Sequence, residues 1–272
     1  SVFTQEDPGP LPPPPIYTYE AELKDIDFGE EDVRKILACL KTDKACGPDG
    51  ISPLILAKAS SSLAKPIAYL FRLSLDSGDI PDDWRQAVVS PIFKKGSRSE
   101  ASNYRPVSLT CVICKCLEKL VRQKMLSHLQ DNDLISKDQH GFVPGRSCTT
   151  QLLEVLDQWT EILDDAGTVD AVYMDYLKAF DTVPHRRLLM KVEAHGITGK
   201  VLKWIEAFLR DRHQRVAVSG IMSSQADVSS GIPQGSVVGP LLFVVFINDL
   251  PRSVRSNVKM FADDTKVYTR SD

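Results

Sequence analysis

The stretch VKMFADDTKVY, residues 258 to 268, reads as two short strands joined by an acidic turn. Val258 and Met260 alternate with other residues, which is the two-residue period of a half-buried strand. Asp263 and Asp264 then interrupt the apolar pattern, although strand interiors normally exclude Asp and adjacent like charges repel each other. Taken alone, the pair has two explanations: a tight turn, which Asp tolerates well, or negative charge held out for a cation.

Composition restricts the class of protein. The chain has 272 residues, 43% of them hydrophobic and 25% charged, with a net charge of −3. This length suffices for one large domain or two small ones, and the aliphatic content excludes general disorder. The longest apolar run, about Val237 to Ile247, contains Gly239 and Pro240 and is too short to cross a bilayer, so we expect no membrane association. The net charge argues weakly against a nucleic-acid partner, whereas basic clusters such as KKGSR at 94–98 argue weakly for one.

The six cysteines do not form the pattern of a disulfide scaffold. Cys111, Cys114 and Cys116 form a C-x-x-C-x-C cluster that could suggest zinc. No second Cys or His pair follows at the spacing of a structural zinc site, so buried thiols are the favoured interpretation. Because no signal peptide is visible either, we expect an intracellular protein, in the nucleus or the cytoplasm.

Hydrophobic periodicity divides the chain into three parts. Residues 1–19 carry EDPGPLPPPP and are predicted to be a proline-rich disordered tail. Residues 20–76 are predicted to be a helical extension, and residues 77–272 to mix helices and strands, so the fold class is α+β. Beyond the extension we expect helices at Val112–Leu129, Thr149–Leu163, Pro184–Ala194 (capped by Thr182), Lys200–Leu209 and 240–250, and strands at Trp84–Phe93, 103–110, 171–175, 215–220 and in the opening stretch.

Carboxylates at strand ends are the main chemical signal. Several common catalytic signatures are missing, including the P-loop and the G-x-S-x-G and H-E-x-x-H motifs. Asp175 ends the short apolar segment AVYMD, which we expect to be a buried strand. If this strand and the acidic hairpin are neighbours, three carboxylates converge, and such a concentration of charge requires a cation. Magnesium prefers oxygen ligands, and two magnesium ions can stabilise the attacking and leaving oxygens of a phosphoryl transfer.

Six blocks in order give the chain a specific resemblance. They are KACGPDGIS, PIFKKGS with NYRPVSL, QHGFVPGRSC, the strand-end Asp with KAFDTV, GIPQGSVVGPLLF, and INDLP with FADD. This order resembles reverse transcriptases of non-LTR (LINE-like) retrotransposons of the jockey and chicken-repeat type. The resemblance implies a right-hand polymerase fold, with helical fingers and a palm containing an antiparallel sheet. Residues 77–272 would be a C-terminally truncated reverse transcriptase domain without its thumb.

The resemblance also implies roles for individual residues. Asp175 and Asp263 would be the principal ligands of two Mg²⁺ ions, with Asp264 as a third carboxylate and the Tyr176 carbonyl as a further metal contact. The residues implied to contact the nucleotide are Lys94, Lys95 and Arg105 at the triphosphate, Phe180 as a steric gate against the sugar 2′-hydroxyl, and Gln234 and Gly235 in the loop that packs on the nucleotide and template base. Lys94 and Lys95 have an alternative interpretation as lysines of a solvated turn, and Phe180 has one as a core residue.

Other residues in these blocks have structural interpretations or depart from the family pattern. Asp181 and His185 are expected to cap a helix, and Asp249 to lie in a turn. Cys46 stands where the family usually has proline, Val143 where arginine is common, and Leu177 where a small polar residue is usual, so a nucleic-acid contact at Val143 is in doubt.

The implied function is RNA-directed DNA synthesis, in which a DNA primer is extended on an RNA template with deoxynucleoside triphosphates. The alternatives are a catalytically silent, nucleic-acid-binding relic of a retroelement and, less favoured, an unrelated calcium- or magnesium-binding domain, since no D-x-D-x-D-G loop is present.

Overall fold

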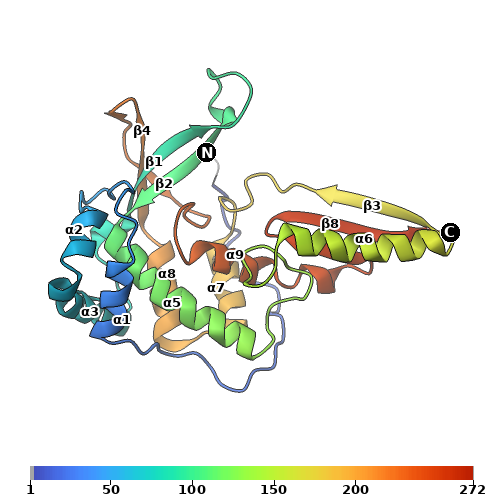
Figure 1. The fold of residues 1–272 in the computed structure, drawn as a ribbon, viewed down its shortest axis with the longest axis horizontal. Helices are drawn as coiled ribbons and strands as arrows, with labels where there is room; N and C mark the ends of the chain where they lie inside the picture. Colours follow the sequence, from blue (N-terminus) through green and yellow to red (C-terminus); the bar gives the residue numbers. More distant parts are fainter. Residues whose placement is uncertain (1–2, 272) are drawn as a thin grey trace.

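The computed structural model describes residues 3–271 and contains helices and strands in mixed order (Figure 1). The helices are α1 (Glu30–Ala38), α2 (Pro53–Lys58), α3 (Ser60–Ser77), α4 (Asp82–Arg85), α5 (Val112–Asp131), α6 (Cys148–Asp164), α7 (His185–Ala194), α8 (Gly199–Leu209) and α9 (Gly239–Ile247), with 3₁₀ turns η1 (Ala101–Asn103) and η2 (Leu250–Ser253). The strands are β1 (Gln86–Phe93), β2 (Tyr104–Thr110), β3 (Thr168–Met174), β4 (Arg212–Val218), β5 (Ile221–Met222), β6 (Ala226–Val228), β7 (Asn257–Phe261) and β8 (Asp264–Ser271).

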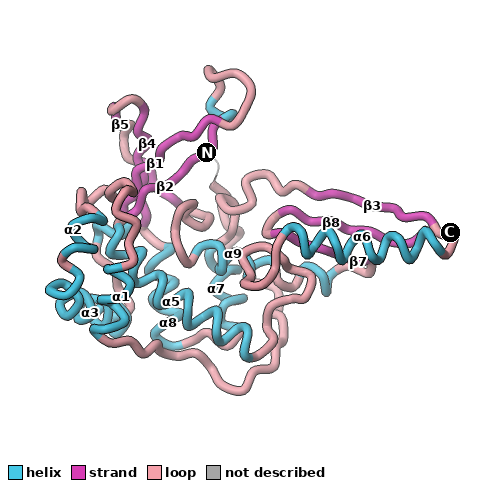
Figure 2. Tube along the Cα trace, in the orientation of Figure 1, coloured by secondary structure: helices cyan, strands magenta, loops and turns pink. Residues whose placement is uncertain are grey.

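The strands form two separate sheets (Figure 2). A five-stranded sheet has the order β2-β1-β4-β5, with β6 also paired to β4, and only the β1–β4 pairing is parallel. A three-stranded antiparallel sheet has the order β3-β8-β7, and α6 lies along it. The α+β class expected from the sequence is therefore confirmed.

The hydrophobic core lies in the helical body between the two sheets. Helix α5 crosses this body and buries Leu117, Val121 and Met125, which are spaced four residues apart and so share one face. Helix α9 buries residues on every side, including Leu242 and Phe243, as a helix inside a core does. Cys111, Cys114 and Cys116 are buried free thiols, as expected.

The N-terminal segment runs over the surface of this body. From residue 3 to the start of α1 it has no helix, and its only strand-like pairing is a bridge between Leu23 and Ile197. The Glu6 carboxylate accepts hydrogen bonds from the Arg186 and Arg187 backbone N–H groups at 3.0 and 3.2 Å. Within residues 3–271, no helix is long and apolar enough to span a membrane.

Four local expectations were wrong. Trp84 lies in the short helix α4, and the strand begins two residues later. Strand β3 is an edge strand rather than a buried one, with Val172 62% and Tyr173 67% exposed.

The Thr182 hydroxyl does not cap α7, because it donates to the carbonyls of Lys178 and Ala179, and Glu6 supplies the acceptor at that helix end instead. Nor do Asp181 and His185 cap a helix. They contact the loop at 231–234: the Asp181 carboxylate accepts from Gln234, and His185 bonds to the Gly231 carbonyl.

Candidate active site

The acidic pair lies at the tip of the β7–β8 hairpin. Phe261 pairs with Asp264, so Ala262 and Asp263 are the two central residues of a tight turn. Ala262 has φ = 57°, a left-handed conformation that an L-residue with a side chain adopts at a cost. The simple turn that the sequence allowed is therefore present, and it is a strained one.

Strand β3 brings a third carboxylate to this tip. Its last residue, Met174, pairs with Thr265 of β8, so the next residue, Asp175, follows at the level of Asp264. Asp175 and Asp264 are exposed, whereas Asp263 is half-buried. Antiparallel pairing thus places one acid from a distant part of the chain beside the two acids of the hairpin.

Electrostatic interactions connect four of the candidate residues. Burial raises the pKa of Asp263 above its ordinary value, and the charges of Asp264 and Asp175 raise it further. The nearby Arg105 guanidinium lowers the same pKa. Arg105 lies on β2 opposite Ile92 of β1, so this positive charge comes from the five-stranded sheet.

Phe180 packs in an aromatic cluster next to this site. Its ring stacks on Phe243 of α9, with centroids 4.3 Å apart and planes 18° apart, and it meets Phe142 edge to face. Its carbonyl accepts a hydrogen bond from the Ile232 N–H at 2.8 Å. The ring is half-buried, and Tyr176, four residues earlier, is 37% exposed.

The loop containing Gln234 and Gly235 links strand β2 to the segment between β3 and α7. The Gln234 carbonyl accepts from the Ser108 N–H of β2 at 2.9 Å, and the Gln234 amide donates to the Asp181 carboxylate at 3.0 Å. Gly235 has φ = 105°, and a Cβ there would lie 2.6 Å from the Ser108 carbonyl oxygen. Only glycine permits this close approach of the loop to β2.

Lys94 and Lys95 are exposed at the end of β1, where the Lys94 N–H donates to the Asn103 carbonyl. The β1–β2 hairpin projects from the body, well separated from the three-stranded sheet (Figure 1). The charge of Arg105 acts on Asp263 across this separation, whereas neither lysine is brought to the acids.

Two buried polar residues that the sequence reasoning missed support the site. Gln139 is fully buried and hydrogen-bonds the backbone of Ala262. Glu118 of α5 is also fully buried, and its carboxylate accepts from the Val237 and Val238 N–H groups at 2.6 and 3.1 Å, at the start of α9. Its position gave a signal, because an acid on the apolar face of an amphipathic helix needs a buried partner.

The carboxylates have the chemistry of a hard-cation site, since all the candidate donors are oxygens and Asp263 is subject to repulsion from both neighbouring acids. In the arrangement described for residues 3–271, no three Asp, Glu, His or Cys side chains are close enough to bind one metal ion together.

Comparison with known proteins gives the family of the chain. The model of the family "Reverse transcriptase (RNA-dependent DNA polymerase)" matches residues 92–272. The RNA-directed DNA polymerase from mobile element jockey of Drosophila melanogaster is 30% identical over 250 residues, which cover 89% of this chain and 27% of that protein. The probable RNA-directed DNA polymerase from transposon X-element of the same organism is 28% identical over 246 residues, covering 88% and 27%.

The chain thus spans about a quarter of the length of these curated relatives. The resemblance to non-LTR retrotransposon proteins that the sequence motifs indicated is confirmed over most of the chain. With two thirds of its residues matched by the family model, the chain belongs to the reverse transcriptase family.

Proposed function

We propose that the chain is the polymerase core of an RNA-directed DNA polymerase, which extends a DNA primer on an RNA template. The observation that carries the proposal is the strand register that places Asp175 at the level of Asp264, next to Asp263, at one end of the three-stranded sheet, where the charge of Arg105 also acts on Asp263. Phosphoryl transfer depends mainly on positioning and charge stabilisation, and acids with a facing arginine are the groups that such a reaction needs.

The proposed fold is that of a right-hand polymerase. The five-stranded sheet, with the projecting β1–β2 hairpin, would form part of the fingers. The three-stranded sheet and α6 would form the palm, and the space over the acidic tip would receive primer and template. The loop at Gln234 and Gly235 bonds to β2 on one side and to Asp181, in the segment after β3, on the other.

Asp175 and Asp263 would hold two Mg²⁺ ions, with Asp264 and the Tyr176 carbonyl in supporting positions. When bound, these ions would lower the pKa of the primer hydroxyl and stabilise the charge that develops on the phosphate. The carboxylates would locate the reacting phosphate, and their mutual repulsion would be relieved by a cation.

Other side chains would bind the nucleotide. Arg105 would hold phosphate oxygens through its planar guanidinium, while Lys94 and Lys95 would reach them only if the β1–β2 hairpin moves toward the palm. Phe180 would exclude a 2′-hydroxyl from the sugar site, and Gly235 would let the backbone approach the base.

The test is primer extension on an RNA template with deoxynucleotides and magnesium, alongside RNA binding. Asp175→Asn and Asp263→Asn should each reduce synthesis at least about 10³-fold, because each removes a carboxylate that would hold the Mg²⁺ ions, and neither should weaken RNA binding. Asp170→Asn, an exposed acid five residues earlier on β3, is the matched control and should retain activity. Near-normal synthesis by either site variant would refute the metal site. RNA binding without any synthesis by the wild-type chain would favour the silent relic.

A further inference from the structure

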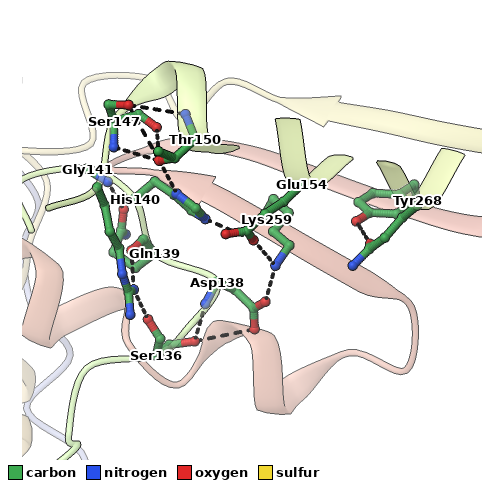
Figure 3. A network of polar contacts seen from close by, with 12 residues as sticks. Ser136, Asp138, Gln139, His140, Gly141, Ser147, Thr150, Glu154, Lys259 and Tyr268 are labelled. Carbon is green, nitrogen blue, oxygen red and sulfur yellow. Dashed lines mark hydrogen bonds and ion pairs between the residues drawn. The ribbon is translucent and has the colours of Figure 1, made fainter. Parts of the chain in front are cut away.

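The loop at residues 138–141 pairs with strand β7 directly before the acidic turn. The His140 N–H donates to the Met260 carbonyl, and the Met260 N–H donates to the Asp138 carbonyl, both at 2.8 Å. This is a parallel bridge between Gln139 and Met260. Figure 3 shows the loop and its polar contacts beside the hairpin. The loop thus acts as a short extra strand on the free edge of β7.

The side chain of Gln139 continues this pairing to the turn itself. Its Oε1 accepts from the N–H of Ala262 at 2.8 Å and from that of Gly141 at 2.7 Å, and its Nε2 lies 3.4 Å from the Ala262 carbonyl. Both N–H groups can only donate, so the amide oxygen must face them, which fixes the side-chain orientation. Gln139 is fully buried, and water therefore cannot replace these bonds.

The turn needs such support because its local conformation is unfavourable. Ala262 has a positive φ, and the adjacent Asp263 is repelled by two other acids. A strained conformation persists only where the surrounding structure holds it. Gly141 adds a backbone contact, since a Cβ at this residue would lie only 2.3 Å from the Ala262 nitrogen.

An ion-pair network anchors the loop to the sheet and to α6. Lys259 of β7 is only 8% exposed, and its ammonium group contacts Asp138 at 3.0 Å and Glu154 at 2.9 Å (Figure 3). Arg146 donates to the carbonyl oxygen of Gln139 at 2.6 Å. The loop is therefore fixed at both ends, so that Gln139 can transmit that rigidity to the turn.

We propose that Gln139 is a positioning residue for DNA synthesis, which holds the Ala262 turn so that Asp263 faces the reacting phosphate. The proposal rests on the proposed function of the acidic site and assigns Gln139 no contact with nucleotide or metal. Its distinguishing feature is that one buried amide satisfies both sides of the peptide backbone at the residue before the catalytic acid.

The test compares Gln139→Met, which keeps the side-chain length without hydrogen bonds, with Gln158→Met. Gln158 of α6 accepts from the Tyr268 hydroxyl of the same hairpin, away from the tip, and is the matched control. Amide hydrogen exchange by NMR measures the Ala262 N–H against the Val267 N–H in the middle of β8. Primer extension measures kcat and the KM for deoxynucleotide.

In Gln139→Met we expect Ala262 exchange to accelerate at least about tenfold relative to Val267, because the amide loses its only described acceptor. A displacement of the acid by about 1 Å should lower kcat about 100-fold, with KM changed less than threefold. Gln158→Met should leave both the Ala262 exchange and kcat within threefold of wild type.

A second variant, Gln139→Glu, retains an oxygen acceptor and should keep Ala262 protected, while its charge beside Asp263 should move the acidic limb of the pH–rate profile upward. This variant decides the matter if Gln139→Met does not fold. Unchanged Ala262 exchange in Gln139→Met, or unprotected Ala262 in folded Gln139→Glu, would overturn the proposal. If the wild-type chain makes no DNA, the proposed function fails, but the exchange rates still test whether Gln139 holds the Ala262 turn.

Discussion

Replacing Gly141 with Ala would place a methyl group against the backbone of the acidic turn. The new Cβ would lie 2.3 Å from the Ala262 nitrogen and 2.9 Å from the Phe261 carbonyl carbon. Ordinary contacts of this kind begin near 3.4 Å, so the loop and the turn must separate by about 1 Å. The hydrogen bond from Ala262 to Gln139, now 2.8 Å, would then exceed the range of a hydrogen bond.

The expected loss of stability follows from these two effects. Overpacking costs about 1–3 kcal/mol, and a buried N–H without an acceptor costs about 1–3 kcal/mol. Moving the loop away from the turn relieves the overpacking but breaks the hydrogen bond, so the two costs are not fully additive. We expect a total loss of about 3 kcal/mol in the free energy of unfolding. For a chain of this size that corresponds to a fall of about 6–12 °C in Tm, at about 2–4 °C per kcal/mol.

Thermal unfolding with urea titration measures this change, and Gly145→Ala is the control in the same loop. Gly145 has a positive φ of 77° but open space around it, so its substitution should cost only about 1–2 kcal/mol of backbone strain. Synthesis should fall about 100-fold in Gly141→Ala, since the turn proposed to carry the catalytic acid moves, and little in Gly145→Ala. If Gly141→Ala melts within 1 °C of wild type, the close packing inferred for this turn is wrong.

Substitutions at three other residues test the site from different directions. Phe180→Val should allow ribonucleotides to be used, measured as the ratio of kcat/KM for deoxy- and ribonucleotides, and unchanged sugar discrimination would reject the gate. Glu118→Ala should lower the free energy of unfolding by about 2–4 kcal/mol, and Glu118→Gln by less, because Gln keeps an oxygen for the two N–H groups of the α9 loop. Burial raises the pKa of Glu118 in the folded state. The stability of the wild type should therefore fall as the pH rises from the unfolded-state pKa of Glu118 to its folded-state pKa. Urea unfolding across this pH interval should show that fall in the wild type but not in Glu118→Gln. The pKa of Asp263 is also raised, so its ionised form destabilises the folded state, and Asp263→Asn should be more stable than wild type at pH 7. The gain should be only a few tenths of a kcal/mol, because solvent screens a half-exposed group, and it should disappear near pH 3. A variant less stable than wild type at pH 7 would contradict this.

Local features of the fold could be predicted from the sequence because their signals are local. The apolar spacing of Val112–Leu129 gave helix α5, and alternation around FADD gave the β7–β8 hairpin. The pairing of β3 with β8 was different, because residue patterns alone left it conditional on the two strands being neighbours. The order of motifs resembling a known family supplied the missing long-range information.

Features that depend on contacts between segments far apart in the sequence could not be predicted. The segment AVYM is apolar enough for a buried strand, yet β3 is an edge strand, because composition does not state what covers a face. The acceptor at the start of α7 is Glu6, far away in the sequence, so a rule based on neighbouring residues chose Thr182 instead. Gln139 was missed for the same reason, since its partner Ala262 is 123 residues away.

The candidate site contradicts local preference at the positions where chemistry is expected. A tight turn of this hand favours glycine at the residue of positive φ, but Ala262 occupies it, and like charges follow at Asp263 and Asp264. Buried contacts from elsewhere support the strained turn, chiefly those of Gln139, whose loop is anchored by the Lys259 ion pairs. Asp263→Asn should therefore stabilise the chain while removing function, whereas substitutions at the supporting residues should reduce both stability and function. Measuring stability and synthesis together separates the two groups, which neither measurement can do alone.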